Sequence, residues 1–425
     1  MPESNESSAQ EATPATSRRR FLLTGGALGL GAAGAAAAAA GIHAVAPTRE
    51  PAAPGDRVPF YGEHQAGIAT PEQDRLAFAA FDVTTTDRTA LMALLGSWAA
   101  AASRMVNGQE IGSVETHPQA PPVDTGEAMG LGPARLTVTV GFGPTLFDDR
   151  FGIADRRPAA LEPLPSLPAD LLVPERSNGD LCVQACSDDP QVAFHVIRNF
   201  ARIARGRAVM RWSQLGFGRT SSTSQAQATP RNLMGFKDGT NNIKREDLAA
   251  MDQHVWVGSE TDQPWMVGGS YLVTRRIRMM IESWDADFLA DQEAVIGRTK
   301  IVGAPLGAEA EFDTVDLAAM RDGQPVIPMD AHIRLAAPET NGGVRMLRRG
   351  YSFTDGTDPA TGQLDAGLFF IAFQKNAHEQ FVPVQRRLGQ SDALNEYIKH
   401  VGSGLFAIPP GLSGPGDWYG KALFT

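Results

Sequence analysis

The chain has 425 residues with 48 acidic and 38 basic side chains, which gives a formal net charge of −10. Basic and aromatic residues form no array suited to nucleic acid, so we expect no nucleic-acid partner. An acidic surface favours cationic or neutral partners only weakly.

Residues 1–46 have the pattern of an export signal. The cluster Arg18-Arg-Arg20 precedes an Ala/Gly-rich stretch over residues 23–40, and the A-x-A cleavage sequence Ala44-Val-Ala46 follows. This pattern predicts a twin-arginine signal peptide that is removed on export to the periplasm or the extracellular space. The stretch is too weakly apolar for a stable membrane anchor. The alternative is a chance arginine cluster before an Ala-rich tail.

Residues 47–230 have the pattern of one structural unit. A helix is predicted at residues 87–105, where apolar side chains recur on one helical face, and an Asp-Pro start predicts another at residues 189–204. The elements alternate in the order βαββαβ. Strands are predicted at residues 78–83, 136–142, 181–186 and 208–214.

Residues 231–425 repeat this order. We therefore predict an α+β fold of two ferredoxin-like βαββαβ units, with antiparallel sheets and flanking helices. Residues 161–174 and 216–230 are expected to form long surface loops, the second joining the units. Strands are predicted at residues 270–280, 344–353, 367–374 and 404–408, and helices at residues 285–296 and 378–401, with a break at Gly389 in the last.

The two cysteines fall in one predicted strand. Cys182 and Cys186 would share a face of that strand but lie roughly 13 Å apart. A disulfide needs Cα atoms within about 7 Å. We expect two buried free thiols, and a metal site there lacks further ligands nearby.

Three segments carry residues suited to haem chemistry. Gly235-Phe-Lys-Asp-Gly239 places a carboxylate in a glycine-flanked loop, His332 could ligate a metal, and Arg348-Arg349 supplies fixed cations. An imidazole on one side of the iron, with an acid/base and a cation on the other, are the parts of a haem peroxide site. Because strand residues alternate, only one of the two arginines can face the cofactor.

These ordered motifs resemble the dye-decolorising peroxidase family, in its exported deferrochelatase/peroxidase branch, over residues from about 61 to the C-terminus. The resemblance implies the doubled ferredoxin-like fold and one haem b per chain, held mainly by the second unit. It implies that His332 is the proximal iron ligand, that Asp238 moves the peroxide proton, and that Arg348 stabilises the charge that develops as the O–O bond breaks. Arg349 would then point away, to solvent or to a haem propionate.

The resemblance also suggests further contacts with the cofactor. In relatives an acidic residue after the strand at 367–374 would accept from the second nitrogen of His332, but this chain has Lys375-Asn376 there. An Asn-Pro-Arg run common after the proximal histidine is replaced by Ala337-Pro338-Glu339. Residues expected to line the pocket are Gly239, Thr240, Asn241 and Phe370, and Arg334 is a second propionate candidate.

The function predicted from these features is that of an exported haem b peroxidase, which reduces hydrogen peroxide and oxidises dyes, phenolics or other small one-electron donors. Bulky dyes would react at the surface through Trp256, Trp265 or Tyr351. Three alternatives stay open: iron release from haem beside components of an iron-uptake system, a haem carrier without turnover, and a haem-free ferredoxin-like protein. Sheet edges that need covering are compatible with a homo-oligomer.

The export signal can be tested directly. Changing Arg18 and Arg19 to Lys should trap the precursor in the cytoplasm, because the twin-arginine pair is the feature that the export machinery reads. Fractionation of cells that express a reporter fused to residues 1–46 checks this. Normal export of the changed reporter would mean that another route is used.

Overall fold

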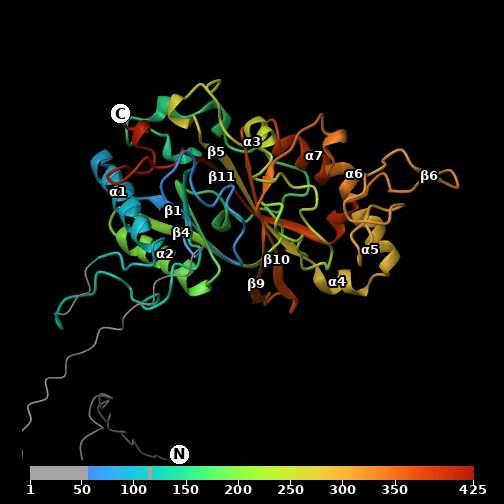
Figure 1. The fold of residues 1–425 in the computed structure, drawn as a ribbon, viewed down its shortest axis with the longest axis horizontal. Helices are drawn as coiled ribbons and strands as arrows, with labels where there is room; N and C mark the ends of the chain where they lie inside the picture. The colour runs from blue at the N-terminus through green and yellow to red at the C-terminus, as the bar shows by residue number, and fades with distance from the viewer. Residues whose placement is uncertain (1–55, 113–116) are drawn as a thin grey trace, which may run out of the picture. The chain divides into compact units, whose positions relative to one another are not determined.

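The computed structural model describes residues 56–112 and 117–425, so the expected export signal lies outside the described residues. The first half forms a four-stranded antiparallel sheet in the order β4-β1-β3-β2, the order of a ferredoxin-like βαββαβ unit. Helices α1 and α2 pack against this sheet (Figure 1). The bounds are β1 Arg75–Val83, α1 Arg88–Met105, β2 Thr137–Phe142, β3 Leu181–Ser187, α2 Pro190–Ile203 and β4 Ala208–Arg219.

The second half repeats the arrangement, with strand order β11-β5-β10-β9. In Figure 1 the helices of the second unit lie together on the right, and α1 and α2 lie on the left, with the strands between the two groups. Between the two units runs a segment that contains α3 Leu248–His254. The bounds are β5 Ser270–Met279, α4 Ile281–Ala286, α5 Leu289–Ile296, β6 Met320–Arg321, β7 Gln324–Pro325, α6 His332–Ala336, β8 Leu347–Arg348, β9 Tyr351–Thr357, β10 Leu364–Gln374, α7 Phe381–Ser391 and β11 Ile398–Ile408.

The two sheets join at two short seams to form one closed ring of strands. At one seam Ala407 of β11 pairs with Phe142 of β2, and at the other β4 pairs with β9. Side chains that alternate along each strand therefore point either into the ring or out of it. On β10, Phe369, Ile371 and Phe373 belong to the inner core, which leaves Leu368 and Phe370 on the outer face.

The cysteine prediction is confirmed. Cys182 and Cys186 both lie on β3, both are fully buried, and both are free. Their side chains join the inner core of the ring. Burial raises the pKa of both thiols, because a thiolate would lose its hydration there.

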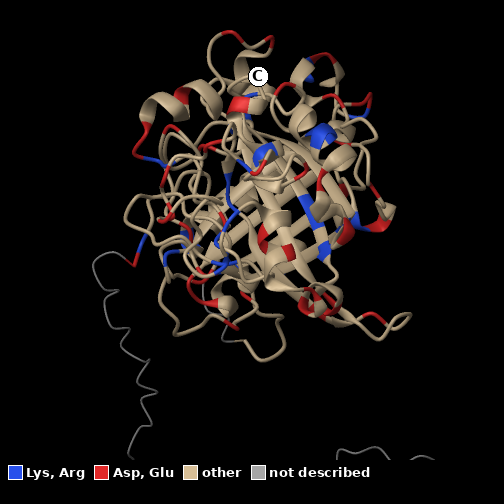
Figure 2. Cartoon of the chain, turned by 90° about the vertical axis from the view of Figure 1, so that its right-hand side faces the viewer, with Lys and Arg blue, Asp and Glu red and all other residues tan. Residues whose placement is uncertain are grey.

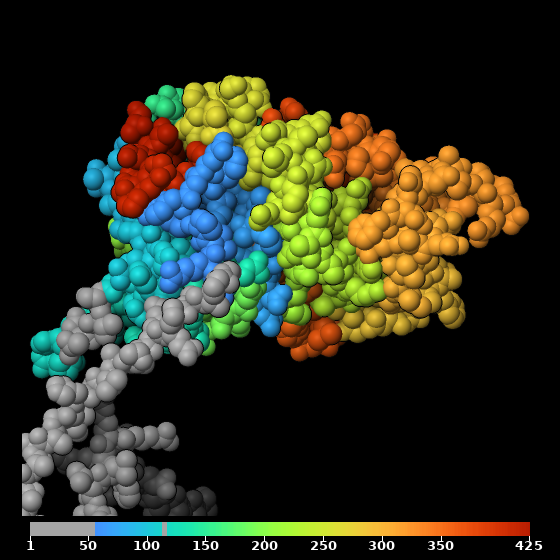
Figure 3. Space-filling model, in the orientation of Figure 1, coloured from blue at the N-terminus to red at the C-terminus, as the bar shows by residue number. Residues whose placement is uncertain are grey.

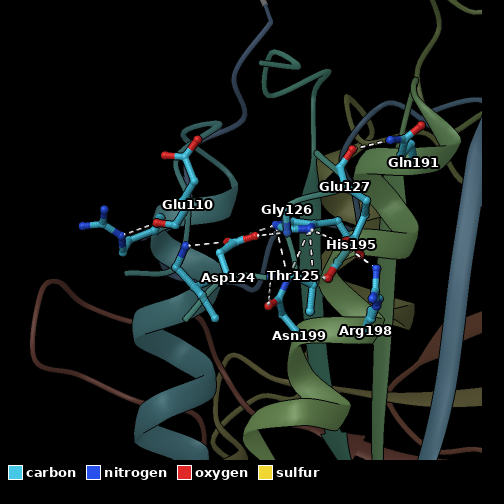
Figure 4. A network of polar contacts seen from close by, with 11 residues as sticks. Glu110, Asp124, Thr125, Gly126, Glu127, Gln191, His195, Arg198 and Asn199 are labelled. Carbon is cyan, nitrogen blue, oxygen red and sulfur yellow. Dashed lines mark hydrogen bonds and ion pairs between the residues drawn. The ribbon is translucent and has the colours of Figure 1, made fainter. Parts of the chain in front are cut away.

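A polar network holds the segment between α1 and β2 against α2 (Figure 4). His195 of α2 is buried, and its Nε2 lies 3.4 Å from Asp124 Oδ2. Asn199, one turn further along α2, donates to Thr125 Oγ1 at 2.8 Å. Asp124 in turn accepts from the backbone amide of Ile111 at 2.9 Å. These contacts fix a long connection whose described residues form no helix or strand.

Four predicted elements differ from those observed, and two of the differences concern strands. β4 continues to Arg219, so the loop expected from residue 216 begins four residues later. The strand expected over residues 344–353 is divided into β8 and β9 by Arg349 and Gly350. A Cβ on Gly350 would lie 2.7 Å from Thr220 Oγ1, so a larger residue at this position would force a neighbour to move.

The other two differences concern helices. Residues 285–296 do not form one helix, because α4 ends at Ala286 and α5 begins at Leu289. The helix expected over residues 378–401 stops at Ser391, and β11 has already begun at Ile398. Between them Asp392 caps a 3₁₀ turn by accepting from the amide of Leu394. Gly389 lies inside α7 and does not break it.

Two further observations concern the helices and the surface of the described residues. No helix in residues 56–112 and 117–425 is both long and apolar enough to cross a bilayer. On the side drawn in Figure 2, acidic and basic positions are interspersed over the helices and loops.

Gly389 gives a test of this packing. A Cβ at Gly389 would lie 2.2 Å from the carbonyl oxygen of Pro168, whereas a Cβ at Gly96 of α1 meets nothing within 4 Å. Gly389→Ala should therefore lower the free energy of unfolding by about 1–3 kcal/mol. Gly96→Ala should raise it by about 0.5–1 kcal/mol, because alanine favours a helix interior. Chemical denaturation of both variants checks the pair, and equal effects would contradict the close contact with Pro168.

Candidate active site

A cavity of about 510 Å³ lies against the outer face of the second unit's sheet. Its volume is in the range of small-molecule and cofactor sites. One wall is the sheet itself, with Ile277 and Met279 of β5 and Leu368 and Phe370 of β10. The opposite walls come from α6, α7 and the loop that precedes α3. The alternation of β10 explains why Phe370 faces this cavity, as predicted, while Phe373 is in the inner core.

His332 stands at the start of α6 and lines the cavity. Its Nδ1 lies 2.6 Å from Oδ2 of Asp392, whose side chain is 1% exposed. The other carboxylate oxygen of Asp392 accepts from the amide of Leu394 at 2.9 Å. With Nδ1 engaged, Nε2 is the nitrogen available to a ligand in the cavity.

Asp392 also controls the charge of His332. Burial alone would lower the pKa of His332, but the charge of Asp392 and its hydrogen bond outweigh burial and raise that pKa. Asp238 across the cavity acts in the same direction, and Arg348 opposes it. The acceptor for the second histidine nitrogen, which the sequence left open, is therefore Asp392. Lys375, after β10, pairs with Glu260 instead.

Asp238 and Arg348 meet at the cavity although they lie 110 residues apart in the chain. Arg348 Nη1 donates to Asp238 Oδ1 at 2.8 Å, and Asn232 donates to the other carboxylate oxygen at 3.3 Å. Gly235 and Gly239 both have positive φ values, of +83° and +82°, which fold the loop sharply around the carboxylate. Gly239, Thr240 and Asn241 line the cavity beside it, where they were predicted.

The backbone of Arg348 is held by Asn242. The amide of Arg348 donates to Asn242 Oδ1, and Asn242 Nδ2 donates to the carbonyl of Arg348, both at 2.8 Å. Arg349 is turned the other way and is fully buried, where it donates to the carbonyl of Thr70 and to Gln73 Oε1. The prediction that Arg349 reaches solvent or a propionate was therefore wrong.

Three more predicted positions differ in the structure. Arg334 is buried and donates to the backbone carbonyls of Ile327 and Pro328, so it does not line the cavity. Tyr351 and Trp265 are buried and are not surface residues. Trp256 is half-buried and stacks on His64 with ring centroids 3.7 Å apart.

The cavity suits a flat apolar cofactor that carries a metal and acidic side groups. It offers one available imidazole nitrogen, apolar walls and, on the opposite side, a paired carboxylate and guanidinium. Cationic side chains that the sequence did not single out also line it and could pair with acidic groups of a ligand: Arg275, Arg298 and Arg345. Among the described residues, no group of three His, Cys, Asp or Glu side chains could hold a bare metal ion.

Family models match both halves of the chain. Residues 65–218 match the N-terminal domain of Dyp-type peroxidases, and residues 229–413 match the C-terminal domain. The chain belongs to the dye-decolorising peroxidase family. It is 38% identical over 413 residues to a protein named deferrochelatase from Escherichia coli K12, covering 96% of each chain. A deferrochelatase from Yersinia pseudotuberculosis is 39% identical over 423 residues, covering 96% of this chain and 94% of its own.

Solved structures of dye-decolorising peroxidases share the fold. DtpA from Streptomyces lividans, in an oxyferrous/water mixed complex, is 42% identical with a TM-score of 0.80, over 87% of this chain and 98% of its own. A dye-decolorising peroxidase from Cellulomonas bogoriensis is 40% identical with a TM-score of 0.78, over 88% and 99%. This protein is therefore a haem-dependent peroxidase that acts on hydrogen peroxide and a reductant, with two ferredoxin-like units as predicted.

A substitution of Asp392 tests the part of the cavity around His332 without changing Asp238 or Arg348. Asp392→Asn should lower the pKa of His332 and weaken haem retention by about 10–100-fold, because it removes the charged partner of the histidine predicted to bind the iron. Transfer of haem to an excess of an apo-globin measures the loss. Asp330→Asn, an exposed aspartate in the preceding turn, is the matched control. Equal haem loss from both variants would contradict the role of Asp392.

Proposed function

We propose that His332 would hold the iron of one haem b per chain and that Asp238 and Arg348 act on hydrogen peroxide at the other side of the cavity. The support is their arrangement across one cavity: an imidazole oriented by a buried carboxylate, and an acid/base paired with a guanidinium. Bound haem would supply the two electrons that reduce the O–O bond, and the electron donors would then return them. Arg275, Arg298 and Arg345 are our candidates for binding the propionates.

Asp238 is placed to move one proton within the bound peroxide. Its carboxylate takes the proton from one oxygen and returns it to the other, which then leaves as water. Arg348 remains charged at every working pH and stabilises the negative charge that develops on the departing oxygen. The single observation that carries this proposal is the 2.8 Å contact between Arg348 Nη1 and Asp238 Oδ1 at the cavity.

The electron donors that we propose are dyes, phenolics and other small one-electron reductants. A cavity of about 510 Å³ is too small for haem together with a bulky dye. Large donors would therefore react at the surface, and of the three side chains predicted for that role Trp256 is the one with solvent access. Replacing Trp256 with Phe while comparing a bulky dye with a small phenol would test this.

Iron release from haem is a second candidate function. The observation that favours it is the similarity, over 96% of the chain, to proteins named deferrochelatase. Release of iron would leave free porphyrin, which fluoresces, whereas peroxidase turnover leaves the haem intact. An assay that follows dye oxidation and porphyrin fluorescence together separates the two functions from a carrier that shows neither.

We also propose that the protein works outside the cytoplasm. The support is the twin-arginine pattern of residues 1–46, which precedes the described fold. We would expect partners from an iron-uptake system only if the protein is shown to release iron from haem.

Substitutions of Asp238 and Arg348 test the proposed mechanism. Asp238→Asn should keep haem but slow the first reaction with peroxide by about 10²–10⁴-fold, the usual contribution of a positioned acid/base. Arg348→Leu should slow it by a comparable factor through loss of charge stabilisation. Stopped-flow mixing of the haem-loaded variants with peroxide measures both rates. Asp252→Asn, an exposed aspartate on α3, is the matched control.

If both distal variants react at the wild-type rate, neither residue does this chemistry. The haem-carrier alternative would then be favoured.

A further inference from the structure

The long connection between α5 and α6 packs against the loop that carries Asp238. In Figure 3 this connection, coloured orange, lies beside the yellow-green segment that follows β4. It contains the small β6–β7 hairpin and many exposed side chains. Glu311 differs from its exposed neighbours in being only 9% exposed, and it lines the cavity together with residues 312–315.

Both carboxylate oxygens of Glu311 are used by residues close to Asp238. Oε2 forms an ion pair with Lys237 Nζ, and Oε1 accepts from the hydroxyl of Thr240 at 3.1 Å. Lys237 directly precedes Asp238 in the chain, and Thr240 is two residues after it. The backbone of Glu311 is itself fixed, because its carbonyl accepts from Arg298 Nη1 at 3.0 Å.

A second set of contacts ties the same two segments together. Arg231 donates to the carbonyls of Lys300 at 2.6 Å and Ile301 at 2.7 Å. Gly303 packs so closely on Lys237 that a Cβ there would lie 2.8 Å from Lys237 Cδ. The loop around Asp238 is thus held from outside, along its length, by the connection between α5 and α6.

These outer contacts add to hydrogen bonds within the loop, where the amide of Asp238 donates to the carbonyl of Pro230 and that of Asn232 to the carbonyl of Phe236, both at 3.0 Å. The two flanking glycines at 235 and 239 permit many backbone conformations when they are not restrained. The carboxylate of Asp238 accepts from the side chains of Arg348 and Asn232, and the position of its backbone is set by the loop. A shift of about 1 Å in a catalytic group can cost a large part of the rate.

From these contacts we infer that Glu311 is a positioning residue for Asp238. It holds the loop through Lys237 on one side of Asp238 and through Thr240 on the other. This inference rests on the proposed role of Asp238. Glu311 touches neither peroxide nor haem in this scheme. It also neutralises Lys237, whose ammonium group would otherwise be left partly buried and unpaired one residue from Asp238.

The test is a double-mutant cycle on the haem-loaded protein. Glu311→Gln keeps the size of the side chain and a carbonyl for Thr240, but it loses the ion pair with Lys237. The first reaction with peroxide should slow about tenfold, the lower end for loss of a residue that orients a functional group, with the haem spectrum unchanged. In the Asp238→Asn background the same change should have little further effect, because the two residues act as one unit.

Glu309→Gln, an exposed glutamate in the same connection, is the matched control and should react at the wild-type rate. Equal slowing by Glu311→Gln in both backgrounds, or none in the wild type, would overturn the inference. If Asp238→Asn itself reacts normally, the proposed function fails instead. If Glu311→Gln does not fold, the exchanged pair Lys237→Glu with Glu311→Lys decides, since positioning requires that it recover most of the rate lost in Lys237→Glu alone.

Discussion

The contact between Asp238 and Arg348 is the interaction on which the cavity depends. It joins the loop after the first unit to the short strand β8 of the second, across 110 residues of chain. Asn242 makes the join rigid, because its amide group exchanges two hydrogen bonds with the backbone of Arg348. The two halves of the chain are therefore joined by these side-chain contacts as well as by the strand pairing at the two seams. The chemistry attributed to the second unit depends on a loop supplied from outside it.

The same principle holds on both sides of the cavity. His332 is oriented by Asp392, which lies 60 residues away and is fixed by capping a 3₁₀ turn. Each functional side chain is thus held by a polar group from another segment, and each of those groups has a fixed position of its own. Side chains that must keep one orientation in a cavity of this size need such support, since the surrounding apolar walls are not directional.

Local sequence patterns predicted most of the fold, for reasons that the structure explains. Both helices of the first unit begin after an aspartate cap, at Asp87 and Asp189, and their apolar faces pack on the sheet. Errors came where tertiary contacts override local preference. The stretch 378–401 was predicted as helix, yet it holds a helix, a turn and the start of β11, because β11 pairs with β5 over ten residues from each strand.

The functional site shows the same limit more sharply. The motifs identified His332, Asp238 and Arg348, and the structure brings all three to one cavity. Asp392 was missed because it lay inside a stretch predicted as helix, although an aspartate followed by Ala-Leu-Asn-Glu has the pattern of a helix start. Arg334 and Arg349 were assigned to propionates because they stand beside motif residues. Neighbours in sequence that alternate on a strand or begin a helix point in different directions, and these two arginines instead support the backbone at Ile327 and Thr70. Nearness to a motif therefore predicts which segment builds a site, and only the packing of distant segments decides which side chains enter it.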